Sequence, residues 1–149
     1  MTLFPYTTLF RSRAHVTFDG GRTWSMYPVN SDSAYQATGD PALAFDAAGN
    51  AYYGTLGFRF VAGSITNPDV LVSSSSDGGK TWSTARVAAG SGTAGSVGDL
   101  LDKEYVAAWG DGNAIVTYGD FQLGQLAGDR KSTRLNSSHH TTSRMPSSA

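Results

Sequence analysis

A seven-residue segment occurs twice in the chain. Residues 18–24 read Phe-Asp-Gly-Gly-Arg-Thr-Trp, and residues 76–82, which follow 58 positions later, read Ser-Asp-Gly-Gly-Lys-Thr-Trp. A second repeat of different composition runs in phase with the first. An apolar segment that follows Asp40 returns after Asp102, 62 positions later, and each copy leads to a Gly-containing turn and another apolar segment. Two unrelated signals with a period near 60 residues indicate one structural unit that is used more than once.

The repeated unit is predicted to consist of strands. Its apolar segments are short and rich in Val, Ile, Tyr and Phe, and Asp-Gly, Gly-Asn and Gly-Gly pairs separate them at hairpin spacing. No segment shows a sustained helical period. One complete unit can be traced, with four strands expected at residues 42–45, 51–56, 69–75 and 82–87. Because four antiparallel strands in about 60 residues is the size of a β-propeller blade, the expected fold is all-β with about two blades.

Charge and glycine are unevenly distributed and divide the chain into three parts. All 12 acidic residues and all 18 glycines fall between His15 and Asp129, together with five of the 11 Lys and Arg residues. The sequence therefore predicts a folded part at residues 14–129, an N-terminal extension at 1–13 and a disordered tail at 130–149. The tail is a mixture of Ser, Thr and Arg that offers few apolar residues for a core. Residues 3–12 and 130–140 also resemble translated sequencing-adapter sequence, which implies extensions that are not native to the gene.

Composition argues against several classes of protein. The chain has no cysteine, which excludes a disulfide framework and a cysteine-ligated metal site. No apolar run approaches the length of a transmembrane helix, and the N-terminal residues lack the charge order of a secretory signal. The acidic middle argues against nucleic acid and anionic membranes as partners, since phosphate binding needs clustered Lys and Arg. His15 is the only histidine outside the tail at residues 130–149, and we expect neither a metal nor another cofactor.

The composition of the repeated Asp-Gly-Gly segment suits the closing of a hairpin. An aspartate accepts hydrogen bonds from turn amides, glycine allows positive φ, threonine returns its hydroxyl to the turn, and tryptophan packs between sheets. The pattern resembles the Asp-box, or bacterial neuraminidase repeat, of the sialidase superfamily. The second copy matches completely, and the first lacks only the leading serine, where Thr17 stands. The residues expected to have this structural role are Asp19, Gly21, Thr23 and Trp24, and Ser75, Asp77, Gly79, Thr81 and Trp82.

The resemblance covers about residues 15–129 and implies a propeller of four-stranded antiparallel blades in a secreted, extracellular or periplasmic parent protein that acts on glycans. It also implies a set of catalytic groups: three arginines that bind the substrate carboxylate, a tyrosine nucleophile activated by a glutamate, and an aspartate acid/base. An arginine triad cannot be assembled from these residues, because Arg22 lies in a box turn and Arg86 on an outer strand. Only Arg59, in the long connection at residues 57–68, is expected on the open face.

The candidate catalytic residues are therefore few. They are the residues at the starts of the innermost strands, Asp40, Asp102, Glu104 and Tyr105, together with Arg59. We expect the first four to point toward the central channel of a propeller, where a carboxylate would serve as acid/base or bind a sugar hydroxyl. The alternative is structural: Asp40 caps the turn before Pro41, and Asp102 pairs with Lys103 or Arg59.

Two functions are consistent with the sequence. The first is a sialidase-like retaining glycoside hydrolase, of which this chain would be an inactive piece. The second is a noncatalytic Asp-box propeller that binds glycans or proteins. Closed propellers have about four to eight blades, so a chain with about two is expected to expose blade edges that self-associate.

Overall fold

The computed structural model describes residues 12–29, 32–61, 63–91, 100–121 and 141–144. All regular structure in these residues is strand, and the strands form antiparallel sheets. This confirms the predicted all-β class. The described parts of the chain contain no helix with the length and apolar character needed to cross a membrane.

The centre of the fold is a four-stranded antiparallel sheet with the strand order β3-β4-β7-β8. Its strands are β3 (Ala37–Phe45), β4 (Ala51–Phe58), β7 (Asp69–Ser75) and β8 (Arg86–Ala89). β7 has the bounds expected from the sequence, whereas β3 begins earlier and β4 ends later than expected. β8 begins at Arg86 and not at Trp82, because Trp82 turns into the core and donates its indole N–H to the Gly79 carbonyl.

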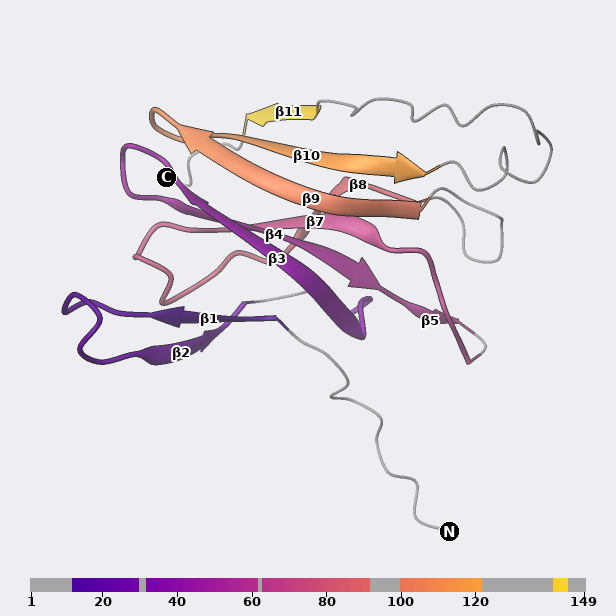
Figure 1. The fold of residues 1–149 in the computed structure, drawn as a ribbon, viewed down its shortest axis with the longest axis horizontal. Coiled ribbons are helices and arrows are strands. Elements are labelled where there is room, and N and C mark those ends of the chain that lie inside the picture. Colours follow the sequence, from indigo (N-terminus) through magenta and orange to yellow (C-terminus); the bar gives the residue numbers. More distant parts are fainter. Residues whose placement is uncertain (1–11, 30–31, 62, 92–99, 122–140, 145–149) are drawn as a thin grey trace, which may run out of the picture.

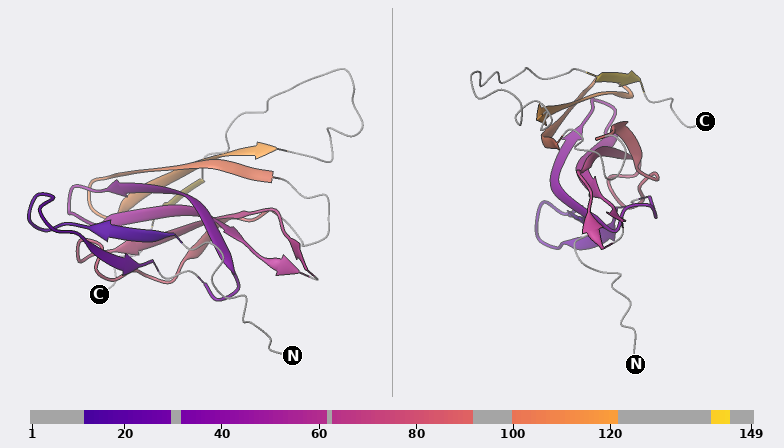
Figure 2. Two further views of the ribbon diagram at one scale, coloured as in Figure 1. Left: turned by 60° about the horizontal axis from the view of Figure 1, so that its bottom comes forward. Right: turned by 90° about the vertical axis from the view of Figure 1, so that its right-hand side faces the viewer.

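Two smaller sheets lie on opposite sides of this central sheet (Figure 1, Figure 2). On one side is the hairpin of β1 (Arg13–Val16) and β2 (Ser25–Pro28). On the other side is a sheet with the order β11-β10-β9, formed by β9 (Leu100–Trp109), β10 (Asn113–Phe121) and β11 (Thr141–Arg144). A short hairpin of β5 (Phe60–Val61) and β6 (Ser64–Ile65) lies in the connection between β4 and β7.

A few residues of the two predicted flanking segments, 1–13 and 130–149, take part in the strands. Arg13 belongs to β1, and the Ser12 amide donates to the Thr38 hydroxyl at 2.8 Å, so the last two residues of the segment 1–13 take part in the fold. In the segment 130–149, the backbone of β11 pairs with β10. The rest of both segments lies outside the described residues, and the N-terminal extension and the disordered tail stay predictions.

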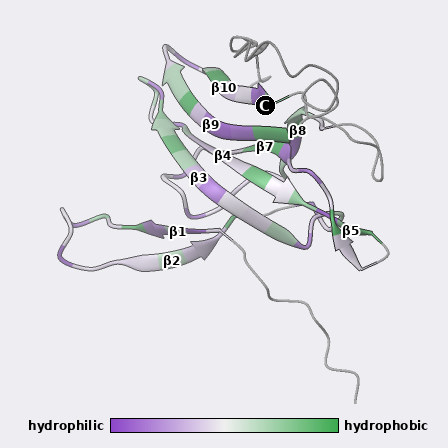
Figure 3. Ribbon diagram, turned by 45° about the vertical axis from the view of Figure 1, so that its right-hand side comes forward, coloured by the Kyte–Doolittle hydropathy of each residue, from purple (hydrophilic) through white to green (hydrophobic). Residues whose placement is uncertain are grey.

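Apolar clusters fill the spaces between the layers. The larger cluster lies between the four-stranded sheet and the β9–β10 sheet, and its buried members are Tyr52, Leu56, Val70, Val72, Leu101, Val106 and Val116. A second cluster on the β1 side contains Ala14, Ala51, Tyr53 and Trp82. Figure 3 shows hydrophobic residues along β3, β7 and β9. Because both faces of the central sheet are covered, β4 and β7 are buried along nearly their whole length.

Strands β3 and β9, each at an edge of its sheet, share an unusual backbone feature. They are called the inner strands below, after the position that the propeller expectation gives them. Each contains one non-glycine residue with positive φ, Asp40 at 48° and Lys103 at 58°, beside a register shift against the paired strand. The turn glycines that follow, Gly49 and Gly112, also have positive φ and are also 63 positions apart. The structural period of the second repeat is therefore 63 residues, and the counterpart of Asp40 is Lys103 and not Asp102 as the sequence suggested.

Candidate functional site

The second Asp-Gly-Gly segment closes its hairpin through one carboxylate. Asp77 accepts hydrogen bonds from the amides of Lys80 and Thr81, both at 2.9 Å, and from the Thr81 hydroxyl at 2.6 Å. The Ser75 hydroxyl donates to the same carboxylate at 2.8 Å and accepts from the Gly79 amide at 2.9 Å. These bonds engage both oxygens of Asp77 within the turn, which leaves the carboxylate little capacity for a ligand.

The first segment repeats this network with one substitution. Asp19 accepts from the amides of Arg22 and Thr23, both at 2.9 Å, and from the Thr23 hydroxyl at 2.7 Å. The Thr17 hydroxyl donates at 2.8 Å, as the Ser75 hydroxyl does in the other copy. The hydrogen bonds from Thr23 and Thr17 hold the pKa of Asp19 at about 2. Threonine therefore replaces serine without loss of a hydrogen bond.

The two Asp-Gly-Gly segments, residues 18–24 and 76–82, are called the boxes below. They differ in their surroundings and contact each other. Trp82 is 6% exposed and packs edge to face on Tyr53, with 5.6 Å between ring centroids, whereas Trp24 is 61% exposed. The Lys80 ammonium lies 4.5 Å from the centroid of the Phe18 ring. The boxes of two adjacent layers therefore lie at the same end of the fold.

A buried aspartate that the sequence analysis did not single out joins the two inner hairpins at this end. Asp46 accepts from the Asn50 amide and side chain, both at 2.9 Å, from the Tyr52 hydroxyl at 3.1 Å, and from the Gly112 amide at 2.9 Å. Burial alone would raise the pKa of Asp46, but these hydrogen bonds hold it well below its usual range. Because Gly112 lies 66 residues from Asp46, no local pattern could have revealed this contact.

Glu104 is buried between two sheets. The described residues do not form a closed propeller, so the expectation that Glu104 faces a central channel stays a prediction. Its side chain lies on the same side of β9 as Val106, and a Cβ atom placed on Gly54 of β4 would lie 4.0 Å from its Cγ. Neither carboxylate oxygen has a hydrogen-bond partner among the described residues. Burial, together with the carboxylates of Asp40 and Asp102, raises the pKa of Glu104 to about 7, although the nearby amides of Glu104 and Leu56 partly offset this rise.

The other candidates on β3 and β9 differ from Glu104 in their exposure to solvent. Tyr105 is exposed on the opposite side of β9, because neighbouring residues of a strand point to opposite faces. Asp40 is exposed at its positive-φ position. Asp102 accepts a hydrogen bond from the Lys103 amide at 2.8 Å, so its contact with Lys103 is to the backbone. The described residues contain no group of three or more His, Cys, Asp or Glu side chains arranged to hold a metal ion.

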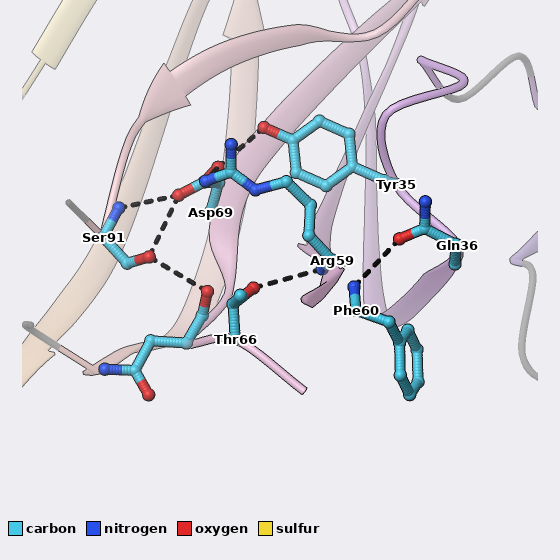
Figure 4. Close-up of polar contacts among 8 residues, drawn as sticks. Tyr35, Gln36, Arg59, Phe60, Thr66, Asp69 and Ser91 are labelled. Atoms are coloured by element: carbon cyan, nitrogen blue, oxygen red, sulfur yellow. Dashed lines mark hydrogen bonds and ion pairs between the residues drawn. The ribbon is translucent and has the colours of Figure 1, made fainter. Parts of the chain in front are cut away.

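Arg59 is paired with an aspartate of β7 and not with Asp102 (Figure 4). Its Nη2 lies 2.9 Å from Oδ2 of Asp69, whose side chain is 4% exposed. The same oxygen accepts from the Tyr35 hydroxyl at 2.7 Å, and the guanidinium lies 5.4 Å from the centroid of the Tyr35 ring. Burial and the hydrogen bond to Asp69 raise the pKa of Tyr35. Arg59 is therefore held in place and charge-balanced.

The second oxygen of Asp69 is also occupied. Oδ1 accepts from the Ser91 amide at 2.7 Å and from the Ser91 hydroxyl at 3.1 Å (Figure 4). The Arg59 amide donates to the Thr66 hydroxyl at 3.2 Å, which joins the two ends of the β4–β7 connection. The cluster thus fixes the loops at the end of the sheet opposite to the boxes. Its hydrogen bonds hold loops and strand ends together, which is a structural role.

Neither a model of a protein family nor a curated protein matches the chain. Among solved structures, the chain is similar to the crystal structure of a protein of unknown function from Dyadobacter fermentans, with 15% sequence identity and a TM-score of 0.47. The match covers 90% of this chain and 34% of the other, so the chain spans about one third of the length of that protein. A likeness at this level shows neither a family nor a function.

Proposed function

We propose that this chain is part of a sialidase-like Asp-box propeller in a secreted, glycan-directed protein. In this proposal its residues supply scaffold and a few carboxyl groups, and they do not supply a complete active site. The observation that carries the proposal is the duplicated box network around Asp19 and Asp77, with the same donors at nearly the same distances 58 residues apart.

Exposed apolar positions on the inner strands support the propeller. Leu43 of β3 lies opposite Tyr53 of β4 and shares its face, yet Tyr53 is buried and Leu43 is exposed. Val106, which occupies the position of Leu43 63 residues later, is buried against the four-stranded sheet. Conversely, Tyr105 is exposed whereas its counterpart Ala42 packs on the larger cluster. Val106 and Ala42 are covered by the contact between the four-stranded sheet and the β9–β10 sheet. A further repeat unit on each side would cover Leu43 and Tyr105 in the same way.

The chemistry supports an incomplete glycosidase site. A retaining glycosidase needs several groups that converge on the charge developing at the sugar. Glu104 has the near-neutral pKa of a general acid but is buried between sheets, and Tyr105 is exposed on the opposite face of β9. Arg59 is neutralised by Asp69 and is not free to bind a substrate carboxylate. We infer that any glycan contact made by these residues is weak and is not followed by hydrolysis.

A noncatalytic binding propeller is the second candidate. The pairing of Arg59 with Asp69 favours it, because the only candidate arginine on the open face then has a structural role. In such a protein the same sheets would present a binding surface for glycans or proteins and would need no acid/base pair.

Saturation-transfer NMR with sialyllactose tests the glycan proposal on the full chain. We expect a weak signal that decreases in Asp102→Asn and is unchanged in Asp111→Asn, which alters an exposed turn residue. Tight binding that Asp102→Asn leaves intact, without hydrolysis, would favour the noncatalytic propeller. The complete absence of a transfer signal for sialyllactose would contradict the sialoside-directed proposal.

A further inference from the structure

Glu104 lies at the contact between two sheets that approach each other unusually closely. A Cβ atom on Gly54 of β4 would lie 2.5 Å from Cγ2 of Val106 and 4.0 Å from Cγ of Glu104. Glu104 itself is 6% exposed. Its carboxyl group therefore occupies the packed space between the four-stranded sheet and the β9–β10 sheet, beside the larger apolar cluster.

This carboxyl group has little to stabilise its charged form: the nearby amides of Glu104 and Leu56 offset the effect of burial only in part. Both oxygens lack a hydrogen-bond partner in the described parts of the chain. A buried carboxylate without hydrogen bonds or a counter-ion is strongly destabilising, whereas the neutral acid at the same place costs much less. The packing thus favours the neutral form of Glu104.

The charged and titratable groups on the surrounding strands do not change this conclusion. Asp40 of β3 and Asp102 of β9 each carry a negative charge that disfavours ionisation of Glu104. β4 contributes no charged residue. Lys103 of β9 is exposed, and the acid of β7 is already paired with Arg59. The residues concerned are Asp40 on β3, Tyr52 and Tyr53 on β4, Asp69 on β7, Asp102, Lys103 and Tyr105 on β9, and Tyr118 and Asp120 on β10.

We propose that Glu104 links the contact between the two sheets to protonation, so that the sheets pack closely when its carboxyl group is neutral and loosen when it ionises. This proposal concerns the packing of two repeats and does not depend on the glycan-directed function proposed above. It gives the fold a built-in response to pH in the neutral range, at a position where the other repeat carries Pro41 and has no ionisable group.

The sign of the effect follows from the raised pKa. In the unfolded chain the Glu104 carboxyl ionises near 4.5, and in the folded chain near 7. The folded state therefore holds an extra proton between these values, and stability decreases as pH rises through this interval. Below pH 4.5 Glu104 is neutral in both states and does not weaken the contact between the sheets. Above pH 7 the decrease in stability due to Glu104 has reached its full size.

Thermal melts of the full chain between pH 5 and pH 8.5 test the proposal. We expect the melting temperature of the wild type to fall by about 5 °C or more over this range, a size typical of a shift of this magnitude in a domain of this length. Glu104→Gln, which keeps the shape and removes the charge, should remove most of the fall. Taking the difference between the two proteins cancels the pH effects that they share.

Two further variants separate a proton-linked contact from a merely structural residue. Asp102→Asn keeps an acceptor for the Lys103 amide but removes a nearby negative charge, so the fall should move to lower pH. Asp111→Asn, in the exposed turn, should leave the profile unchanged. Hydrogen exchange corrected for its intrinsic pH dependence should show faster exchange of β4 and β9 above pH 7 in the wild type only. Equal pH profiles for the wild type and Glu104→Gln, or an Asp102→Asn profile that does not move, would overturn the proposal.

Discussion

The two boxes differ in how much they contribute to stability, because one is followed by a buried tryptophan and the other by an exposed one. Asp19 and Asp77 make the same hydrogen bonds, but the turn of Asp77 leads to the buried Trp82 and the turn of Asp19 leads to the exposed Trp24. Loss of either carboxylate leaves turn amides without their acceptor. Only in the second box does the turn also hold a core residue in place, so the same chemical change has different structural consequences.

We predict that Asp77→Ala lowers the melting temperature by several degrees and that Asp19→Ala, its matched control, lowers it clearly less. Neither substitution touches a candidate substrate-contacting residue. Differential scanning calorimetry of the two variants beside the wild type measures the difference. Equal losses in both variants would show that the packing of Trp82 does not depend on its box.

Acid should weaken the boxes. The hydrogen bonds from Thr81 to Asp77 hold the pKa of Asp77 well below its usual range, as those from Thr23 do for Asp19. A depressed folded-state pKa adds stability above the ordinary aspartate pKa, and this stability is lost as pH falls below about 4. We predict that melting temperatures decrease from pH 4 to pH 2 and that Asp77→Asn reduces the slope. A slope identical to that of the wild type would contradict the assignment.

Local residue patterns were sufficient to predict the box residues but not the residues joined by tertiary contacts. Asp19 and Asp77 accept bonds from residues at most four positions away, so their composition signals their geometry. Asp46 meets Gly112 across 66 residues, and the Tyr35 hydroxyl meets Asp69 across 34. Such contacts arise from the packing of layers, and no spacing in the sequence identifies them.

At the scale of strands, a close approach between layers depends on a glycine. A Cβ atom on Gly54 would lie 2.5 Å from Cγ2 of Val106, far inside a normal contact. A Cβ atom on Gly39, in the neighbouring strand β3, would lie 3.6 Å from the Phe58 ring, which is an ordinary van der Waals distance. The two glycines therefore differ in how much space their neighbours leave.

We predict that Gly54→Ala destabilises the fold by about 1–3 kcal/mol through overpacking. Gly39→Ala is the control and should change the stability by about 0.5 kcal/mol or less. Chemical denaturation of both variants measures the free energies of unfolding. A Gly54→Ala protein as stable as the control would mean that β4 and β9 do not pack as closely as described.

The sequence predicts a regular strand such as β7 better than a strand with a bulge such as β9. β7 was predicted with its observed bounds, because a run of apolar and small residues ends at a box serine. The burial of Glu104 does not follow from simple alternation along β9, because the bulge at Lys103 changes which face each following residue occupies. A bulge of this kind leaves no reliable mark in the composition.

At the scale of the whole molecule, apolar residues of the inner strands remain exposed. Leu43 is 53% exposed on β3, and Tyr105 and Trp109 are also exposed on β9. We predict concentration-dependent self-association of the isolated chain through these strands. Leu43→Asp should reduce it, whereas Ile65→Asp, at a comparably exposed position in the β5–β6 hairpin, should not. Light scattering coupled to size exclusion measures the masses, and a monomer at all concentrations would contradict this prediction.

We propose that these residues form the scaffold of a sialidase-like propeller and do not form a working glycosidase site. The most direct measurement is the hydrolysis of a fluorogenic sialoside by the purified full chain. We predict no release of the fluorophore above the uncatalysed rate, because Arg59 is paired with Asp69 and Glu104 is buried between two sheets, away from any bound substrate. Hydrolysis that survives purification and disappears in Asp102→Asn would place a working site in this chain and contradict the claim.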